Sequence, residues 1–219
     1  MNFETITIVR LCGIAGILGA LITGAGDLLY NHIPGSTQTI YEKMSSLSQR
    51  RLVSAGALGL IGSWLYLFGA LHLYFVFQSA GEDLTLSIAI TFAWVAIAYG
   101  IAHASYFAIG SNAKLARENG LDIVQAGKAG EALFTKIVMI TYIPVAIASF
   151  FMVYGVVTAH SAYPIWMVIF LPIVPYLLRP VVLKIIRGRV HEIIRDSFDN
   201  FVLLVFFLIS TIVVWNMYW

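Results

Sequence analysis

The chain has few charged residues and a single cysteine. Charged side chains make up 11% of its 219 residues, whereas soluble domains carry about 25%, so an ordinary soluble domain is excluded. The formal net charge of +2 leaves no basic face and excludes a protein that binds nucleic acid through its charge. Cys12 has no second cysteine to pair with, which excludes a disulfide framework and a cysteine-based metal cluster.

Hydrophobic residues are abundant and make up 60% of the chain. Apolar windows of about 19 residues predict six transmembrane helices, each long enough to cross a hydrocarbon core of about 30 Å. The expected fold is all-α, a polytopic integral membrane protein whose partner is the lipid bilayer. Residues 1–219 form one domain in this prediction. The predicted spans are residues 8–30, 52–79, 84–110, 132–158, 162–183 and 198–218.

The distribution of positive charge predicts the orientation of these spans. Of the 13 lysines and arginines, only Arg10 falls on the side that carries both termini. Basic residues mark the cytoplasmic side of a membrane protein, so we expect both termini outside, in a multi-pass protein of the cell membrane. The predicted cytoplasmic loops are residues 31–51, 111–131 and 184–197.

Both longer loops contain predicted helical segments. Ile40, Met44 and Leu47 share one face of a short amphipathic helix, with Ser36 or Thr37 as its cap, and this helix is expected on the inner membrane surface. In the second loop, residues 114–119 are expected to continue the third span until a glycine at position 120 ends the helix.

Asp27 is the first candidate functional residue. It lies three residues beyond the last of a series of small residues at four-residue spacing, which favour the close approach of another helix. It therefore shares that face, points inward, and stands in the last helical turn, where the helix dipole disfavours a negative charge. Asp27 is either a structural carboxylate paired with Arg50 or Arg51, or a substrate-binding or proton-carrying acid. The small residues are Gly16, Ala20 and Gly24.

Polar side chains also recur on one face of the third predicted span. Tyr99, His103 and Tyr106 follow a spacing of three to four residues and so line one side of the helix. A lone membrane histidine is often a packing residue. With a tyrosine on either side and Asp27 at similar depth, this stripe favours a polar cavity.

The fifth predicted span is rich in proline, which removes backbone donors and predicts a kinked helix. Arg179 lies in this kinked stretch, where it either extends to the lipid headgroups, neutralises Asp27 or binds an anionic ligand. Tyr142 lies beside another proline, Pro144, and Asn200 is expected to form an inward hydrogen bond. The prolines of the fifth span are Pro164, Pro172, Pro175 and Pro180.

These residues predict one ligand site in the cytoplasmic half of the membrane, formed by a polar cavity open to the cytoplasm. No zinc-binding histidine pair is present, and His72 and His103 lie at different depths, so neither a metal nor a haem is expected. We expect no cofactor. The predicted ligand-binding residues are Asp27, Tyr99, His103, Tyr106, Tyr142, Arg179 and Asn200.

Three functions remain open at this point. The first is a protein that binds or transports a small or lipid-like molecule, expected as a homodimer because six spans make a small transporter. The second is an intramembrane enzyme for a lipid or isoprenoid substrate, with His103 as acid and base and Asp27 stabilising a developing cation. The third is a structural or accessory subunit in which the polar residues only hold helices together.

Overall fold

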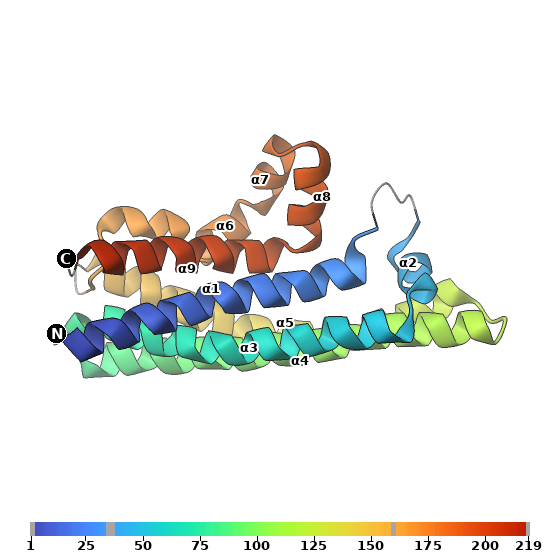
Figure 1. Ribbon diagram of the computed structural model, residues 1–219, viewed down its shortest axis with the longest axis horizontal. Coiled ribbons are helices and arrows are strands. Elements are labelled where there is room, and N and C mark those ends of the chain that lie inside the picture. Colours follow the sequence, from blue (N-terminus) through green and yellow to red (C-terminus); the bar gives the residue numbers. More distant parts are fainter. Residues whose placement is uncertain (1–2, 34–37, 159–160, 218–219) are drawn as a thin grey trace.

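The computed structural model describes residues 3–33, 38–158 and 161–217, which are nearly all helical and contain no strand. The expected all-α class is therefore confirmed. The long helices lie side by side in an elongated bundle (Figure 1). In chain order the elements are α1 (Phe3–Asn31), α2 (Ile40–Ser46), α3 (Gln49–Val76), the 3-10 helix η1 (Gln78–Ala80), α4 (Glu82–Glu118), α5 (Ile123–Val157), the 3-10 helix η2 (Ile165–Phe170), α6 (Ile173–Leu177), α7 (Arg179–Ile185), α8 (Gly188–Asp196) and α9 (Phe198–Met217).

Five helices of the described chain are long and apolar enough to cross a membrane. They pack in the order α9, α1, α3, α4, α5, and η2 and α6 lie between α5 and α9. The start of α1 and the end of α9 lie at the same end of the bundle (Figure 1), where Arg10 donates a hydrogen bond to the carbonyl oxygen of Trp215 at 3.3 Å. These helices support a membrane protein, as the apolar composition predicted.

The fifth predicted span, residues 162–183, is not one kinked helix. It is divided into η2, α6 and α7, and it still runs back along the bundle from the end of α5 toward α9 (Figure 1). Pro172 precedes α6 and Pro180 stands in the first turn of α7, so the backbone donors that a continuous helix needs are missing there. The prolines therefore interrupt the helix that was predicted here.

Several helix boundaries also differ from the prediction. The loop predicted at residues 111–131 is mostly helical, because α4 extends to Glu118 and α5 begins at Ile123. The continuation of this helix and its end at Gly120 are confirmed, since Gly120 has a φ of 68°, which only glycine adopts freely. Residue 218, the end of the last predicted span, lies outside the described residues.

The predicted amphipathic helix exists as α2, and its apolar face packs on the bundle. Met44 and Leu47 are buried, and α2 contacts α4 and α5. Tyr41 donates a hydrogen bond to Glu131 of α5. The proposed caps Ser36 and Thr37 lie outside the described residues.

The actual cap of α2 is Thr39, in a reciprocal capping box with Glu42. The Thr39 backbone amide and hydroxyl both donate to the Glu42 carboxylate at 2.8 Å. These two hydrogen bonds lower the pKa of Glu42. The ionised form of Glu42 therefore stabilises the start of α2.

Glycine allows α1 and α3 to approach each other closely. A Cβ atom added to Gly62 would lie 2.8 Å from the carbonyl oxygen of Gly19, and one added to Gly26 would lie 2.8 Å from the carbonyl oxygen of Ala55. Both distances are shorter than van der Waals contact, so a larger residue would force the two backbones apart. The two helices are thus in direct backbone contact at two levels.

The small-residue face predicted on the first span packs against α9. A Cβ atom added to Gly16 would lie 2.5 Å from the ring of Phe207, and one added to Gly24 would lie 2.9 Å from the hydroxyl of Ser197. Ala20, between them, is buried. This face leads directly to Asp27, one turn further on.

A buried hydrogen-bonded cluster ties the bundle together near the termini. His72 Nδ1 lies 2.9 Å from the carbonyl oxygen of Val9, which only accepts, so the proton of the neutral ring is on Nδ1. His72 Nε2 then accepts from the hydroxyl of Ser210 at 2.6 Å, and Ser210 accepts from the hydroxyl of Tyr163 at 2.5 Å. The cluster joins α1, α3 and α9 to the residue that precedes Pro164 and η2.

Candidate functional site

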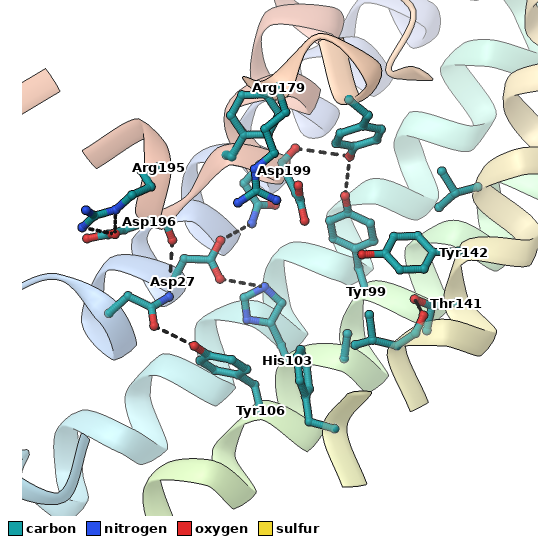
Figure 2. Close-up of a pocket in the computed structure, with 18 of the residues that line it drawn as sticks. Asp27, Tyr99, His103, Tyr106, Thr141, Tyr142, Arg179, Arg195, Asp196 and Asp199 are labelled. Atoms are coloured by element: carbon teal, nitrogen blue, oxygen red, sulfur yellow. Dashed lines mark hydrogen bonds and ion pairs between the residues drawn. The ribbon is translucent and has the colours of Figure 1, made fainter. Parts of the chain in front are cut away.

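A cavity of about 830 Å³ lies between the last turns of α1, the middle of α4 and α5, and the start of α9. Its walls come from α1, α4, α5, α6 and α9, and residues of α2, α7 and α8 complete its rim. All seven residues that the sequence indicated line this cavity: Asp27, Tyr99, His103, Tyr106, Tyr142, Arg179 and Asn200. Figure 2 shows most of them around the opening.

Asp27 belongs to a buried hydrogen-bond chain across three helices. Asn200 Nδ2 of α9 donates to Asp27 Oδ2 at 2.7 Å. The hydroxyl of Tyr66 on α3 donates to Asn200 Oδ1 at 2.8 Å. Asn200 is therefore fixed in orientation by its partners on both sides, and it holds the Asp27 carboxylate toward the cavity, where the side chain is 20% exposed.

His103 is the second neighbour of Asp27. His103 Nε2 lies 3.4 Å from Asp27 Oδ1 (Figure 2). The other side of the imidazole ring packs on Gly59 of α3: a Cβ atom added there would overlap Cγ and Nδ1 of His103 and lie 2.5 Å from its Cβ. His103 Nδ1 is buried and has no hydrogen-bond partner among the described residues. Gly59 thus makes the space that allows His103 to reach Asp27.

The tyrosines of the cavity use their hydroxyl groups within the protein. Tyr106 donates to Asn31 Oδ1 at 2.8 Å. The hydroxyls of Tyr99 and Tyr176 lie 2.6 Å apart, and Tyr176 donates to the carbonyl oxygen of Asp199 at 3.5 Å. Since Tyr176 uses its proton on Asp199, Tyr99 is the donor to Tyr176. These three side chains therefore present rings to the cavity, with no free donor.

The expected arginine partners of Asp27 have other contacts. Arg51 instead completes the end of α1: its Nε donates to the carbonyl oxygen of Leu29 at 2.8 Å and its terminal nitrogen to that of His32 at 2.9 Å. Arg179 lies over the ring of Phe198 at 5.1 Å. Among the described residues, no ion pair joins Asp27 to a lysine or arginine. Pairing of Asp27 with Arg50, Arg51 or Arg179 is thus not seen.

Two arginines on the cavity wall lie beside acids, and a third basic residue, Lys43 of α2, also lines the cavity. Arg195 lies 2.8 Å from Asp196, which is also 3.3 Å from His32 Nδ1. Arg179 attracts the carboxylate of Asp199 through space, and Figure 2 shows the two side chains close to each other at the α7 side. Asp27 therefore differs from the other two acids in its lack of an arginine.

Sequence reasoning missed several residues of this wall. Asp196 and Asp199 carry the signature of helix caps, Asn31 directly follows the first predicted span, and Tyr176 lies inside the fifth. The available signal was weak: Tyr176 precedes Arg179 by three residues, which places the two on one face only if the helix continues. Their positions become clear from the tertiary contacts alone.

The side of the cavity at α5 is apolar and open. Tyr142 lines the cavity and is nonetheless 56% exposed. Its neighbours Met139, Ile140 and Ile143 are also exposed large hydrophobic residues. An apolar rim of this kind suits contact with lipid chains. The apolar cavity residues on this side are Val138, Val145, Ala146 and Ile173.

One family match accompanies these observations. A family model described as "Family of unknown function (DUF6796)" matches residues 1–217. No curated protein and no solved structure matches the chain significantly. The match spans every described helix, so it covers the cavity as a whole.

Proposed function

This chain belongs to the DUF6796 family of unknown function, and we propose from its geometry that it is a membrane protein that binds a small or lipid-like molecule in the cavity beside Asp27. The observation that carries this proposal is the composition of the walls. One wall holds Asp27, Asn200 and His103, and the opposite wall is apolar and opens beside Tyr142. A molecule with one polar end and an apolar body matches both walls.

The proposal includes a topology. The chain crosses the cell membrane six times, with the interrupted η2–α6–α7 segment as the fifth crossing, and both termini face outward. In support, the start of α1, with Arg10, and the end of α9 lie together at one end of the bundle. The turn between α4 and α5 lies at the opposite end (Figure 1), and Lys114 and Arg117 are in the last turns of α4 before it. The cavity then opens toward the cytoplasm.

A cysteine at Asn119 tests the orientation, because Cys12 is buried. We expect a membrane-impermeant thiol reagent to label the Asn119→Cys variant only after the cells are opened. Labelling of intact cells would overturn the proposed topology.

The binding proposal is tested by closing the cavity. Ala146 lines it on α5, while Ala132 is exposed on the same helix and lies outside it. We expect purified wild-type protein and Ala132→Trp to retain a small molecule or lipid at a fixed molar ratio in mass spectrometry of extracts, and Ala146→Trp to lose it. Equal retention by all three proteins, or by none, would contradict the proposal.

The 3.4 Å approach of His103 to Asp27 favours one second candidate, an intramembrane enzyme for a lipid or isoprenoid substrate. Because Nδ1 of His103 faces Gly59, acid–base chemistry would have to use Nε2, next to Asp27. An enzyme converts its lipid in detergent without a gradient, a transporter needs a membrane to move it, and a binding protein does neither. Mass spectrometry of the retained molecule before and after incubation identifies an enzyme, and flux across the membrane of proteoliposomes separates a transporter from a binding protein.

A further inference from the structure

Asp27 is a membrane-embedded carboxylate whose cavity-facing side lacks a cationic partner. Its ion contact is with His103, which is charged only when protonated. By contrast, Asp196 has Arg195 at 2.8 Å, and Asp199 is in the field of Arg179. A carboxylate in a low-dielectric site is stabilised when a positive charge reaches it. Of the three acids in the cavity, Asp27 is the one left for a charge that a ligand brings.

Aromatic rings surround the same space. Three of the four tyrosines in the lining direct their hydroxyl groups to protein acceptors, as described above. What these rings offer to a ligand is therefore their negatively polarised faces and apolar bodies, which attract ammonium groups. Figure 2 shows Tyr99 and Tyr106 on either side of His103, with Tyr142 beside Tyr99. The aromatic lining residues from α4, α5 and α6 are Tyr99, Tyr106, Phe134, Tyr142 and Tyr176.

Two of the three basic side chains that line the cavity lie beside acids, and the third, Lys43, comes from α2 at the rim. Arg195 is neutralised by Asp196, and Arg179 lies over Phe198 and beside Asp199, at the α7 side. An anionic ligand would need free hydrogen-bond donors near Asp27, where Asn200 Nδ2 already donates to that carboxylate. The chemistry next to Asp27 is thus that of acceptors and ring faces.

From this arrangement we propose that the molecule bound in the cavity carries a positively charged ammonium group. The Asp27 carboxylate and the tyrosine rings hold the ammonium group, and the apolar part lies along α5 toward the opening at Tyr142. This inference rests on the proposed binding function and adds the charge of the ligand to it.

The test compares three amphiphiles that share one dodecyl chain: dodecyltrimethylammonium, dodecyl maltoside and dodecanoate. The full chain is placed in phosphatidylglycerol nanodiscs, whose headgroup has no ammonium, and binding is measured by native mass spectrometry. We expect the wild-type protein to bind the ammonium compound at least about tenfold more tightly than the other two. A tenfold ratio corresponds to about 1.4 kcal/mol.

Two variants locate this preference. Asp27→Asn is expected to bind all three amphiphiles equally, whereas Asp83→Asn, an equal loss of charge at an exposed site on α4, keeps the preference. Tyr106→Leu, which removes a ring of the lining next to His103, is expected to weaken ammonium binding several-fold and leave maltoside binding unchanged. A melting curve of each variant establishes that it is folded.

The outcomes separate the two levels of the proposal. Equal binding of the three compounds by the wild-type protein, or a preference for dodecanoate, overturns the ammonium inference while the binding function stands. An ammonium preference that Asp27→Asn retains also overturns the inference. Binding of none of the three in a protein that retains no other molecule overturns the binding function itself.

Discussion

Replacement of Ser210 by alanine measures how much the buried cluster near the termini stabilises the bundle. Ser210 is fully buried, donates to His72 Nε2 at 2.6 Å and accepts from the Tyr163 hydroxyl at 2.5 Å. The alanine side chain removes both interactions and leaves a buried acceptor on His72 and a buried donor on Tyr163. Neither group can turn to water, since both residues are buried.

The size of the effect follows from these two bonds. Hydrogen bonds between membrane helices contribute about 0.6 kcal/mol on average and at most about 1.7 kcal/mol each. Two lost bonds therefore lower the free energy of unfolding by about 1–3 kcal/mol. We expect this loss in reversible unfolding of Ser210→Ala in mixed micelles. The control is Ser105→Ala, because the exposed hydroxyl of Ser105 donates to the carbonyl oxygen of Ile101 in its own helix. We expect this variant to change the free energy of unfolding by no more than about 0.5 kcal/mol.

A double-mutant cycle with Tyr163→Phe then isolates the bond between Tyr163 and Ser210. We expect a coupling free energy of about 0.5–1.7 kcal/mol between the two substitutions. Additive effects of the two changes, or a Ser210→Ala protein as stable as the wild type, would refute the hydrogen-bond network described for this cluster.

Three further changes probe the site and its surroundings. In Gly59→Ala the new methyl group must displace the His103 ring, so we expect the free energy of unfolding to fall by about 1–3 kcal/mol and ligand retention to weaken. The control is Gly56→Ala, in which the methyl group meets only the Tyr30 hydroxyl, at 2.9 Å. Equal ligand retention by the two variants would refute the role of Gly59. Arg51→Gln removes charged donors from the end of α1. Hydrogen bonds from a charged donor contribute about 1.5–3 kcal/mol, so we expect hydrogen exchange to rise about tenfold at the amides of the last turn of α1 and to stay unchanged in α9. Unchanged exchange in α1 would contradict the capping role of Arg51. The hydrogen bonds from Thr39 lower the pKa of Glu42, so ionised Glu42 stabilises α2 at neutral pH, and this stabilisation is lost as the pH falls through the lowered pKa. In the wild type we expect hydrogen exchange at the α2 amides to increase on acidification. An equal increase in Glu42→Gln would show that another group is responsible.

The sequence predicted which residues come together around the cavity better than it predicted the backbone there. Asp27 was recognised because small residues at four-residue spacing mark a packed helix face, and this face does meet α9 at Gly16 and Gly24. Tyr99, His103 and Tyr106 followed from helical periodicity, which places them together whatever the neighbouring helices are. Both arguments depend on local geometry, and the local geometry of long apolar helices is regular.

The interruption of the fifth predicted span and the packing of α2 depend on properties that these patterns do not contain. A hydropathy window sums the transfer free energies of the side chains. It does not register that Pro172 and Pro180 remove backbone hydrogen-bond donors. For α2, the face of Met44 and Leu47 suits a membrane surface and a protein surface equally well, because both are apolar. Only the packing of α4 and α5 decides between them.

The close contact between α1 and α3 has a mechanical consequence for the cavity. Backbones that touch at Gly19 and Gly62, and again at Gly26 and Ala55, have no side-chain layer to deform, so the two helices behave as one stiff plate. The α4–α5 pair is in similar contact, because a Cβ atom added to Gly130 would lie 2.8 Å from the carbonyl oxygen of Ala108. The segment beyond α5 consists of short helices, so we expect a change in the volume of the cavity to come mainly from movement of α6 and α7 against these two helix pairs.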